Sequence, residues 1–482
     1  MAPKVRTRFA PSPTGFMHIG NLRTALYAYL FAKSKGGDFV LRIEDTDQAR
    51  YVEGATDVIY NTLRASNLPH DEGPDVGGNY APYVQSERKQ VYKQYALQLI
   101  ERGEAYYCFC SKQELEQRKT EEGYDRHCRH LTAAEVQHNL SQGKPYVIRQ
   151  KVPVDGLTSF EDAVFGEITV DNKTLDDQVL LKSDGLPTYN FANVVDDHLM
   201  QISHILRGSE YLSSNPKYIL LYKAFGWDVP QFIHLPLIMG KNDDGSVTKL
   251  SKRHGATGFQ ELVDNGYLPS AIINYIALLG WSPKNDRELF TMPQLIEAFL
   301  VEGINKSPAV FDYQKLDWMN GEHIKLLPFD QFCTIALPFA NIQDTPLADK
   351  WREIAALLQS RLHRLSQIPQ MIAFLHQVAP YDTQLFVNQK NKSTLATSVD
   401  CLNAALTVFN SLQEWNADTL YAAFSELAQS KGIKFGQVMW APRIALSGLL
   451  VTPGGAIEIM SIIGKPAAVQ RVESALQLLM GK

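Results

Sequence analysis

The sequence predicts an α/β fold in the N-terminal half of the chain and helical domains after it. At the start, a strand pattern, a loop and a helix pattern are followed by a second strand pattern over residues 38–43. From about residue 262 onward, most apolar residues recur at helical spacing. The chain has 482 residues, which is too long for one hydrophobic core and predicts about three to four domains.

The opening segment, residues 5–43, is expected to form a strand, a loop, a helix and a strand. Pro11 and Pro13 cannot lie inside a central strand, so the first strand ends near Ala10. A glycine then permits a tight turn, and the helix pattern begins at about His18. The loop thus leads into a helix N-terminus, where free N–H groups and the helix dipole favour a phosphate. An ordinary strand–helix–strand unit without a ligand would show the same pattern.

Residues 83–187 mix helix and strand patterns and are expected to form an inserted α+β subdomain. A helix pattern starts at Ser86, and strand patterns cover 105–110, 146–149, 168–170 and 178–182.

Within this insertion, Cys108 and Cys110 lie on the same side of a predicted strand, and Cys128 and His130 form a second pair. Four such ligands suit tetrahedral zinc, which here would be structural. Tyr124 lies close enough in sequence to replace His130, as does His127. The alternative is a set of buried, inert cysteines.

The sheet is expected to continue with strands over 201–206 and 232–237. Arg207 and Glu210 follow the first of these strands, and ligands of open α/β sheets bind beyond the carboxyl ends of strands. Each residue alone could instead be a solvated surface charge, or an acid in the first turn of a helix.

Composition narrows the class of protein. No run of about 18 apolar residues occurs, so we expect no membrane span. Five cysteines are an odd number and indicate no disulfide framework, which predicts a cytoplasmic protein. The formal net charge of −5 counts against nucleic-acid binding unless one face of the molecule is basic. No dimerisation segment is evident, so we expect a monomer.

Two motifs carry a family resemblance. His18-Ile19-Gly20-Asn21 resembles the HIGH motif of class I aminoacyl-tRNA synthetases, with Asn21 in place of the last histidine. Residues 249–253 (Lys-Leu-Ser-Lys-Arg) resemble the KMSKS motif of the same enzymes. The pair is specific, whereas neither motif would decide alone. Residues 8–15 and 43–47 resemble the bacterial glutamyl-tRNA synthetase branch in particular.

The resemblance implies an α/β Rossmann-like catalytic domain with an inserted α+β acceptor-binding subdomain, followed by all-α stem-contact and anticodon-binding domains. The expected boundaries are 1–82 and 188–245 for the split catalytic domain, 83–187 for the insertion, 246–321 for the stem-contact domain and 322–482 for the anticodon-binding domain. Many bacterial members of the family carry zinc in the insertion.

The resemblance also implies the reaction, in which ATP with Mg²⁺ activates L-glutamate for transfer to tRNA(Glu). The expected catalytic residues are His18, Lys249 and Lys252. The expected ATP contacts are Pro11, Ser12, His18, Gly20, Asn21, Glu210, Leu250, Ser251, Lys252 and Arg253. The expected glutamate contacts are Arg8, Ala10, Ser12, Glu44, Tyr189, Asn193 and Arg207. Arginine offers paired donors to a carboxylate, and Glu44 would take the ammonium group.

Three rival interpretations are distinguishable. A glutaminyl-tRNA synthetase would carry a β-barrel anticodon part, whereas residues 322–482 have helix patterns. The short enzyme that glutamylates a modified tRNA nucleoside lacks the C-terminal domain. A non-catalytic RNA- or zinc-binding relative should have lost His18 or Lys252, and both are present.

Overall fold

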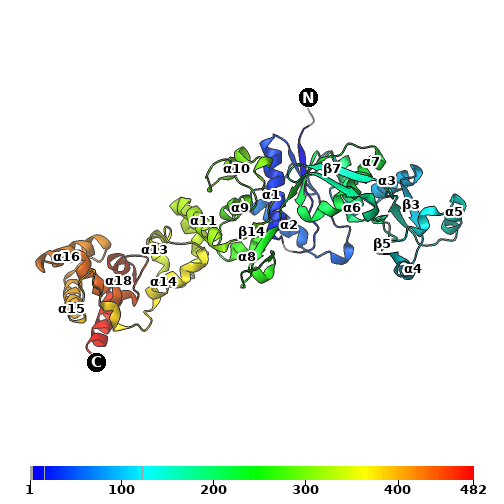
Figure 1. The fold of residues 1–482 in the computed structure, drawn as a ribbon. Helices are drawn as coiled ribbons and strands as arrows, with labels where there is room; N and C mark the ends of the chain where they lie inside the picture. The colour runs from blue at the N-terminus through cyan, green and yellow to red at the C-terminus, as the bar shows by residue number, and fades with distance from the viewer. Residues whose placement is uncertain (1–3, 16, 121–122, 243, 256, 482) are drawn as a thin grey trace. The chain divides into compact units, whose positions relative to one another are not determined.

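The computed structural model describes residues 4–15, 17–120, 123–242, 244–255 and 257–481, without the side chains of Lys119, Thr120 and Lys252. These residues form two compact units (Figure 1). The first unit comprises residues 1–263 and 269–313, and the second comprises residues 264–268 and 314–482. Within the described ranges, no helix is long and apolar enough to span a membrane.

All the strands of the described residues lie in the first unit. They are β1 (Arg6–Phe9), β2 (Asp38–Leu41), β3 (Ala105–Cys108), β4 (Lys119–Thr120), β5 (Gly123–Tyr124), β6 (Val147–Gln150), β7 (Leu157–Asp162), β8 (Gly166–Asp171), β9 (Val179–Leu181), β10 (His204–Gly208), β11 (Gln231–Leu235), β12 (Ile238–Lys241), β13 (Val247–Lys249) and β14 (Ala309–Val310). Its helices are α1 (Ile19–Ser34), α2 (Ala55–Ala65), α3 (Lys89–Glu101), α4 (Lys112–Gln117), α5 (Ala133–Ser141), α6 (Tyr189–Leu199), α7 (Asn215–Phe225), α8 (Phe259–Asp264, ending in the second unit), α9 (Pro269–Ala277) and α10 (Met292–Ala298).

The central strands run parallel in the order β2, β1, β10, β11. β1 pairs with β2, and β10 pairs with β11. β1 lies beside β10, because the Ser203 N–H donates to Arg6 O at 3.0 Å. The chain thus places β2 on one side of β1, and it later places β10 and β11 on the other side. This reversal of strand order marks the place where such sheets bind ligands.

The core of this unit lies between the sheet and its helices. α1 is mostly apolar and mostly buried, and it packs against β1, β2 and β10. α6 and α7 bury large aromatic side chains against the sheet, among them Phe191, Tyr218 and Phe225. Burial of such side chains is the main favourable contribution to folding here.

Two smaller sheets flank the central one. β3, β6 and β9 form an antiparallel sheet, and Figure 1 shows β3, β5, α4 and α5 together at one end of the unit. β12 forms a hairpin with β13 and also pairs with β14. β14 was not predicted from sequence, because its two residues lie in a segment dominated by helical spacing.

The second unit is helical apart from short turns. Its helices are α11 (Tyr313–Leu326, whose first residue belongs to the first unit), α12 (Phe329–Ala340), α13 (Trp351–Leu358), α14 (Ile368–His376), α15 (Leu395–Ser411), α16 (Ala417–Ser430), α17 (Phe435–Ser447) and α18 (Ala456–Leu479). α18 bends at Gly464, whose φ of 79° is outside the helical range. The predicted fold class, α/β followed by α, is confirmed.

The predicted insertion, 83–187, differs from expectation in one respect. β7 was not predicted, and it pairs with β8 on one side and with β11 of the central sheet on the other. The chain therefore returns to the central sheet in the middle of this segment. The domain boundaries given above stay predictions.

Candidate active site

A cleft of about 450 Å³ opens at the carboxyl ends of β1 and β10, where the strand order reverses. Its walls come from the loop after β1, the start of α1, the segment after β10, and the end of β13. The loops that leave the two neighbouring strands diverge at this point, which leaves room for a ligand. The topology therefore identifies this cleft as the candidate active site.

His18 caps α1 at the wall of the cleft. Its Nδ1 accepts a hydrogen bond from the Gly20 N–H at 3.2 Å, which leaves Nε2 for a ligand. The turn is fixed to a distant segment, because the Ile19 N–H donates to Thr257 O at 3.0 Å. Burial, together with the positive charge of Lys249, lowers the pKa of His18. The imidazole is therefore neutral at pH 7 and stands beside free N–H groups that favour an anion.

The lysine-containing loop approaches the cleft from the β12–β13 hairpin. Lys249 is exposed, and its Nζ lies 4.0 Å from Oε1 of Glu210. Leu250 is buried, and its N–H donates to Ile238 O at 3.0 Å. The backbone of Lys252 begins the short helix η6 (Lys252–His254), whereas its side chain lies outside the described part of the chain.

His254 anchors this loop, and sequence analysis did not identify it. Its Nε2 lies 2.9 Å from Oδ1 of Asn242, and its Nδ1 lies 3.0 Å from the backbone nitrogen of Ser251. The ring packs on Gly240, where a Cβ atom would lie 2.5 Å from it. A glycine at 240 is therefore required for the loop to close over the histidine.

Arg207 is buried at the end of β10, and its hydrogen-bond partners are neutral. Its Nε donates to Nε2 of His234 at 3.2 Å, and its Nη2 donates to Oδ1 of Asn215. The Tyr218 ring lies 4.5 Å from the guanidinium carbon. Among the described residues, no carboxylate lies within ion-pair distance of Arg207. A buried cation is stabilised by an anionic partner, so this group is suited to an anionic ligand.

Arg8 has a carboxylate partner already. Its Nε donates to Oδ1 of Asp197 at 3.0 Å, and Arg42 donates to the same oxygen at 2.8 Å. Burial alone would raise the pKa of Asp197, but these two guanidinium groups lower it below its ordinary value. Arg88 donates to the neighbouring Asp196 at 2.7 Å. Arg8 thus belongs to a buried network of cations and anions at the base of the cleft.

Glu44 is part of the same network and keeps one unused oxygen. Its Oε1 accepts from Nη2 of Arg42 at 2.8 Å. Its Oε2 is buried without a hydrogen-bond partner among the described residues. Burial raises the pKa of Glu44, although Arg42 opposes the shift. A positively charged ligand group at Oε2 would satisfy this oxygen and favour the charged carboxylate.

The structure brings most of the predicted site residues together. Those that line the cleft are Arg8, Ala10, Pro11, Ser12, His18, Gly20, Asn21, Tyr189, Arg207, Glu210, Lys249 and Leu250. Glu44, Asn193, Ser251 and Arg253 are not among the described residues that line it. Asn193 is buried in α6 and donates to Tyr189 O at 3.0 Å, so it supports the position of Tyr189 from behind.

A separate cluster of three thiols lies in the predicted insertion. The Sγ atoms of Cys108, Cys110 and Cys128 lie within 4.8 Å of one another. The Tyr124 hydroxyl lies 3.4 Å from the Cys108 Sγ and 3.7 Å from the Cys110 Sγ. His130 is exposed and does not belong to the described cluster. Three thiols and a nearby oxygen fit a tetrahedral zinc ion, with Tyr124 better placed than His130 to provide the fourth ligand.

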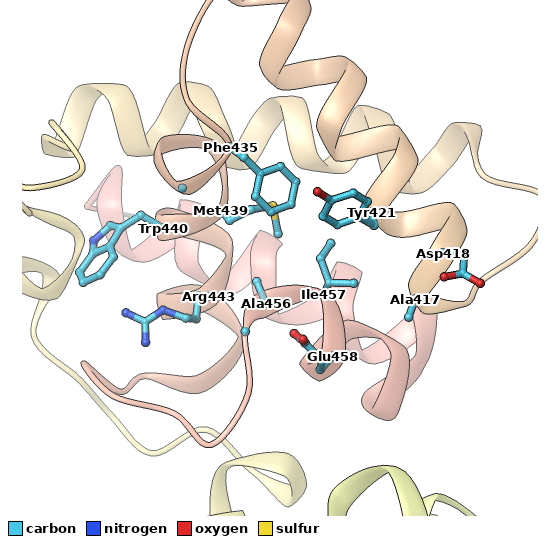
Figure 2. A pocket seen from close by; sticks show the side chains of 12 residues that line it. Ala417, Asp418, Tyr421, Phe435, Met439, Trp440, Arg443, Ala456, Ile457 and Glu458 are labelled. Carbon is cyan, nitrogen blue, oxygen red and sulfur yellow. The ribbon is translucent and has the colours of Figure 1, made fainter. Parts of the chain in front are cut away.

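The second unit has a cavity of its own, of about 540 Å³ (Figure 2). α16 and α17 contribute Tyr421 and Phe435, whose ring centroids lie 5.1 Å apart. The guanidinium carbon of Arg443 lies 4.6 Å from the centroid of the Trp440 ring. Aromatic rings and guanidinium groups are the side chains on which nucleic-acid bases stack.

Two family models match this chain. Residues 4–318 match the family described as "tRNA synthetases class I (E and Q), catalytic domain". Residues 331–476 match the family described as "Anticodon binding domain". The first match covers the unit that contains the cleft, and the second covers most of the helical unit.

The chain is also similar to individual proteins over its whole length. It is 53% identical to the glutamate–tRNA ligase of Clostridium tetani, covering 99% of this chain and 98% of that one. It is 52% identical to the glutamate–tRNA ligase of Clostridium botulinum (strain Eklund 17B / Type B), covering 99% of both chains. A crystal structure of a glutamate tRNA ligase from Elizabethkingia meningosepticum, in complex with its amino acid, superposes with a TM-score of 0.88 at 36% identity, covering 99% of this chain and 100% of that one.

Proposed function

The chain belongs to the glutamate–tRNA ligases, which are class I aminoacyl-tRNA synthetases, and from this premise we propose which residues carry out the reaction. These enzymes charge tRNA(Glu) with glutamate in an ATP-dependent reaction. The α-carboxylate of glutamate attacks the α-phosphorus of ATP, which gives glutamyl-adenylate and pyrophosphate. The terminal adenosine hydroxyl of the tRNA then attacks the activated carbonyl, and AMP leaves. Such chemistry depends mainly on positioning and on charge stabilisation.

ATP lies along the loop after β1 and the start of α1. His18 uses Nε2 to contact the phosphates, since Gly20 already occupies Nδ1. Gly20 lets the nucleoside approach the backbone. Lys249 and Lys252 meet the negative charge that develops on the leaving pyrophosphate, and Mg²⁺ bound with ATP would neutralise part of the same charge. The position of Lys249 beside the cleft supports this assignment.

Glutamate lies between Arg207 and Glu44. Arg207 takes one substrate carboxylate, and the single observation that carries this assignment is that this buried guanidinium has only neutral partners among the described residues. Oε2 of Glu44 takes the substrate ammonium group, because that oxygen is buried and unused. Arg8, Ser12 and Tyr189 complete the pocket, and the charge of Arg207 selects glutamate over neutral glutamine, because a neutral amide would leave this buried cation unpaired.

The remaining assignments concern the rest of the molecule. Residues 83–187 hold the acceptor end of the tRNA, and the cavity between Tyr421 and Arg443 stacks anticodon bases. A zinc ion held by Cys108, Cys110, Cys128 and Tyr124 would stabilise the fold of the insertion and take no part in the reaction. The five free cysteines support a cytoplasmic enzyme, and we propose that it acts as a monomer.

The test is Arg207→Gln, measured by ATP–pyrophosphate exchange with tRNA(Glu) present. We expect the glutamate KM to rise by about tenfold or more, because a charge-assisted pair is worth roughly 1.5–3 kcal/mol, whereas the ATP KM should stay within about twofold. An unchanged glutamate KM would show that Arg207 does not bind the amino acid.

A further inference from the structure

Arg207 is held by a chain of buried side chains that starts outside the cleft. Asp162 ends β7, His234 lies in β11, and Arg207 lies in β10. Oδ2 of Asp162 lies 2.6 Å from Nδ1 of His234, and Nε2 of His234 lies 3.2 Å from Nε of Arg207. Of the three, only Arg207 lines the described cleft, and the other two are fully buried behind it.

The proton positions in this chain follow from arginine chemistry. Arginine keeps its protons in proteins and can only donate, so Nε2 of His234 must be the unprotonated ring nitrogen. Nδ1 therefore carries the proton and donates it to Asp162. Burial lowers the pKa of His234, which favours this neutral form. Asp162 thus fixes the tautomer of His234 by accepting from Nδ1, and Arg207 donates to the unprotonated Nε2 on the other side of the ring.

Asp162 is itself fixed as an acceptor. Its Oδ1 accepts from the backbone N–H groups of Val164 at 3.0 Å and Phe165 at 2.9 Å. Burial alone would raise the pKa of Asp162, but the bonds from His234 and these backbone groups lower it. The carboxylate is therefore charged and held in place, and it can only accept a hydrogen bond from His234.

This arrangement determines which edge of the Arg207 guanidinium is free. His234 occupies Nε and Asn215 occupies one hydrogen of Nη2. The other edge, formed by Nη1 and the second hydrogen of Nη2, can take a carboxylate with two parallel hydrogen bonds. Since His234 and Asn215 are neutral, they orient the guanidinium without cancelling its charge.

We infer that Asp162 and His234 are positioning residues, which hold the free edge of Arg207 towards the substrate carboxylate and so set the selectivity for an anionic amino acid. The inference rests on the proposed role of Arg207 in binding glutamate. Neither residue touches the substrate. Their effect on the reaction passes entirely through the guanidinium.

Two substitutions at His234 separate its two hydrogen bonds. His234→Asn can still donate to Asp162 in the place of Nδ1, but it has no acceptor for Arg207. His234→Gln can place an acceptor near the position of Nε2, but it loses the bond to Asp162. We expect the glutamate KM to rise about tenfold or more in His234→Asn and clearly less in His234→Gln, with the ATP KM unchanged in both.

Asp162→Asn tests the tautomer. An amide at 162 donates to Nδ1, which forces the proton onto Nε2 and sets two donors, His234 and Arg207, against each other. We expect a rise in the glutamate KM similar to that of His234→Asn, although residue 162 lies outside the described cleft lining. His204→Asn is the matched control, because His204 is a partly buried histidine of β10 that lies outside the described cleft lining and whose Nδ1 lies 2.9 Å from the Ser203 hydroxyl.

All variants are assayed as the full chain by pyrophosphate exchange with tRNA(Glu), alongside thermal unfolding. The double variant Asp162→Asn/Arg207→Gln should have the glutamate KM of Arg207→Gln alone, because the two residues act through one contact. Additive effects, or equal rises in the glutamate and ATP KM values, would overturn the inference. If Arg207→Gln raises the glutamate KM and neither Asp162→Asn nor His234→Asn does, the inference fails while the proposed function stands. If Arg207→Gln has no effect, the proposed role of Arg207 fails first.

Discussion

Arg8 and Arg207 carry the same guanidinium group, yet their surroundings leave them with different abilities to bind an anionic ligand. Arg8 shares Asp197 with Arg42, so most of its charge is neutralised by the protein itself. Arg207 meets a neutral imidazole and an amide, which leaves its charge for a ligand. In sequence, Arg8 is only a cation within a predicted strand, and Arg207 is only a cation just after one. Asp197 of α6 and His234 of β11, which distinguish the two arginines, lie far along the chain from the arginine that each contacts.

Lys252 is assigned a role in the transition state, so its removal should slow the reaction without weakening amino-acid binding. We expect Lys252→Ala to lower the rate of pyrophosphate exchange by more than about tenfold, which corresponds to roughly 1.4 kcal/mol of transition-state stabilisation. The glutamate KM should change little. Lys241→Ala, an exposed lysine on β12, serves as the control. A normal exchange rate in Lys252→Ala would contradict the assignment.

Sequence reasoning located the cleft residues that belong to local patterns and missed those defined by distant contacts. His18, Glu210 and Lys249 follow strand ends or start a helix, and such positions can be read from periodicity and from motif resemblance. Asp162, His234 and His254 have no local signal. Each takes its role from a hydrogen-bond partner in another strand or loop, and only the folded structure brings the two residues together.

At the scale of elements, the two strands of the opening segment, residues 5–43, were predicted correctly. The expected strands over 5–10 and 38–43 correspond to β1 and β2, because prolines and glycines mark their ends. β7 was missed, since it is only six residues long, its buried positions Thr158 and Asp162 are polar and the apolar Leu157 is exposed. α6 was also not predicted, although it places Tyr189 at the cleft and Asn193 one turn behind it.

The cluster of Cys108, Cys110 and Cys128 joins β3 to the turn at Cys128 through side chains. The segment around β3 and the turn at Cys128 contribute only a small buried cluster of their own. We therefore expect the purified chain to contain about one zinc ion, and Cys110→Ser to lose it. Hydrogen exchange should become faster over residues 105–150 in that variant and stay unchanged elsewhere.

Cys333→Ser is the matched control, because Cys333 is a buried cysteine of the second unit with no part in the thiol cluster. It should leave both the metal content and the exchange over 105–150 unchanged. A metal-free wild-type chain, with exchange over 105–150 unaffected by Cys110→Ser, would show that the thiols are inert.

At the scale of the whole molecule, the two units should respond differently to acid. Burial lowers the pKa of His18, His198, His204 and His234, all in the first unit. In the second unit it lowers the pKa of His323. A histidine with a lowered pKa binds fewer protons in the folded state than in the unfolded state, so stability is lost as the pH falls below about 6.5.

We therefore expect two unfolding transitions in calorimetry, one for each unit, and a larger fall in the melting temperature of the first unit between pH 7 and pH 5. Limited proteolysis at each temperature identifies which unit has unfolded. Equal shifts of both transitions would show that these histidines do not control the acid response.

The pairing of β7 with β11 has a consequence for engineering and for evolution. An inserted domain can often be exchanged between related proteins as a cassette, provided that few contacts cross its boundary. Here the segment 83–187 contributes β7 to the central sheet, and β7 carries the carboxylate behind Arg207. A chimera that replaced the whole segment would exchange the carboxylate behind Arg207 together with the proposed acceptor-binding part. Recombination between relatives is therefore expected to succeed only at junctions that leave residues 157–171 with the catalytic domain.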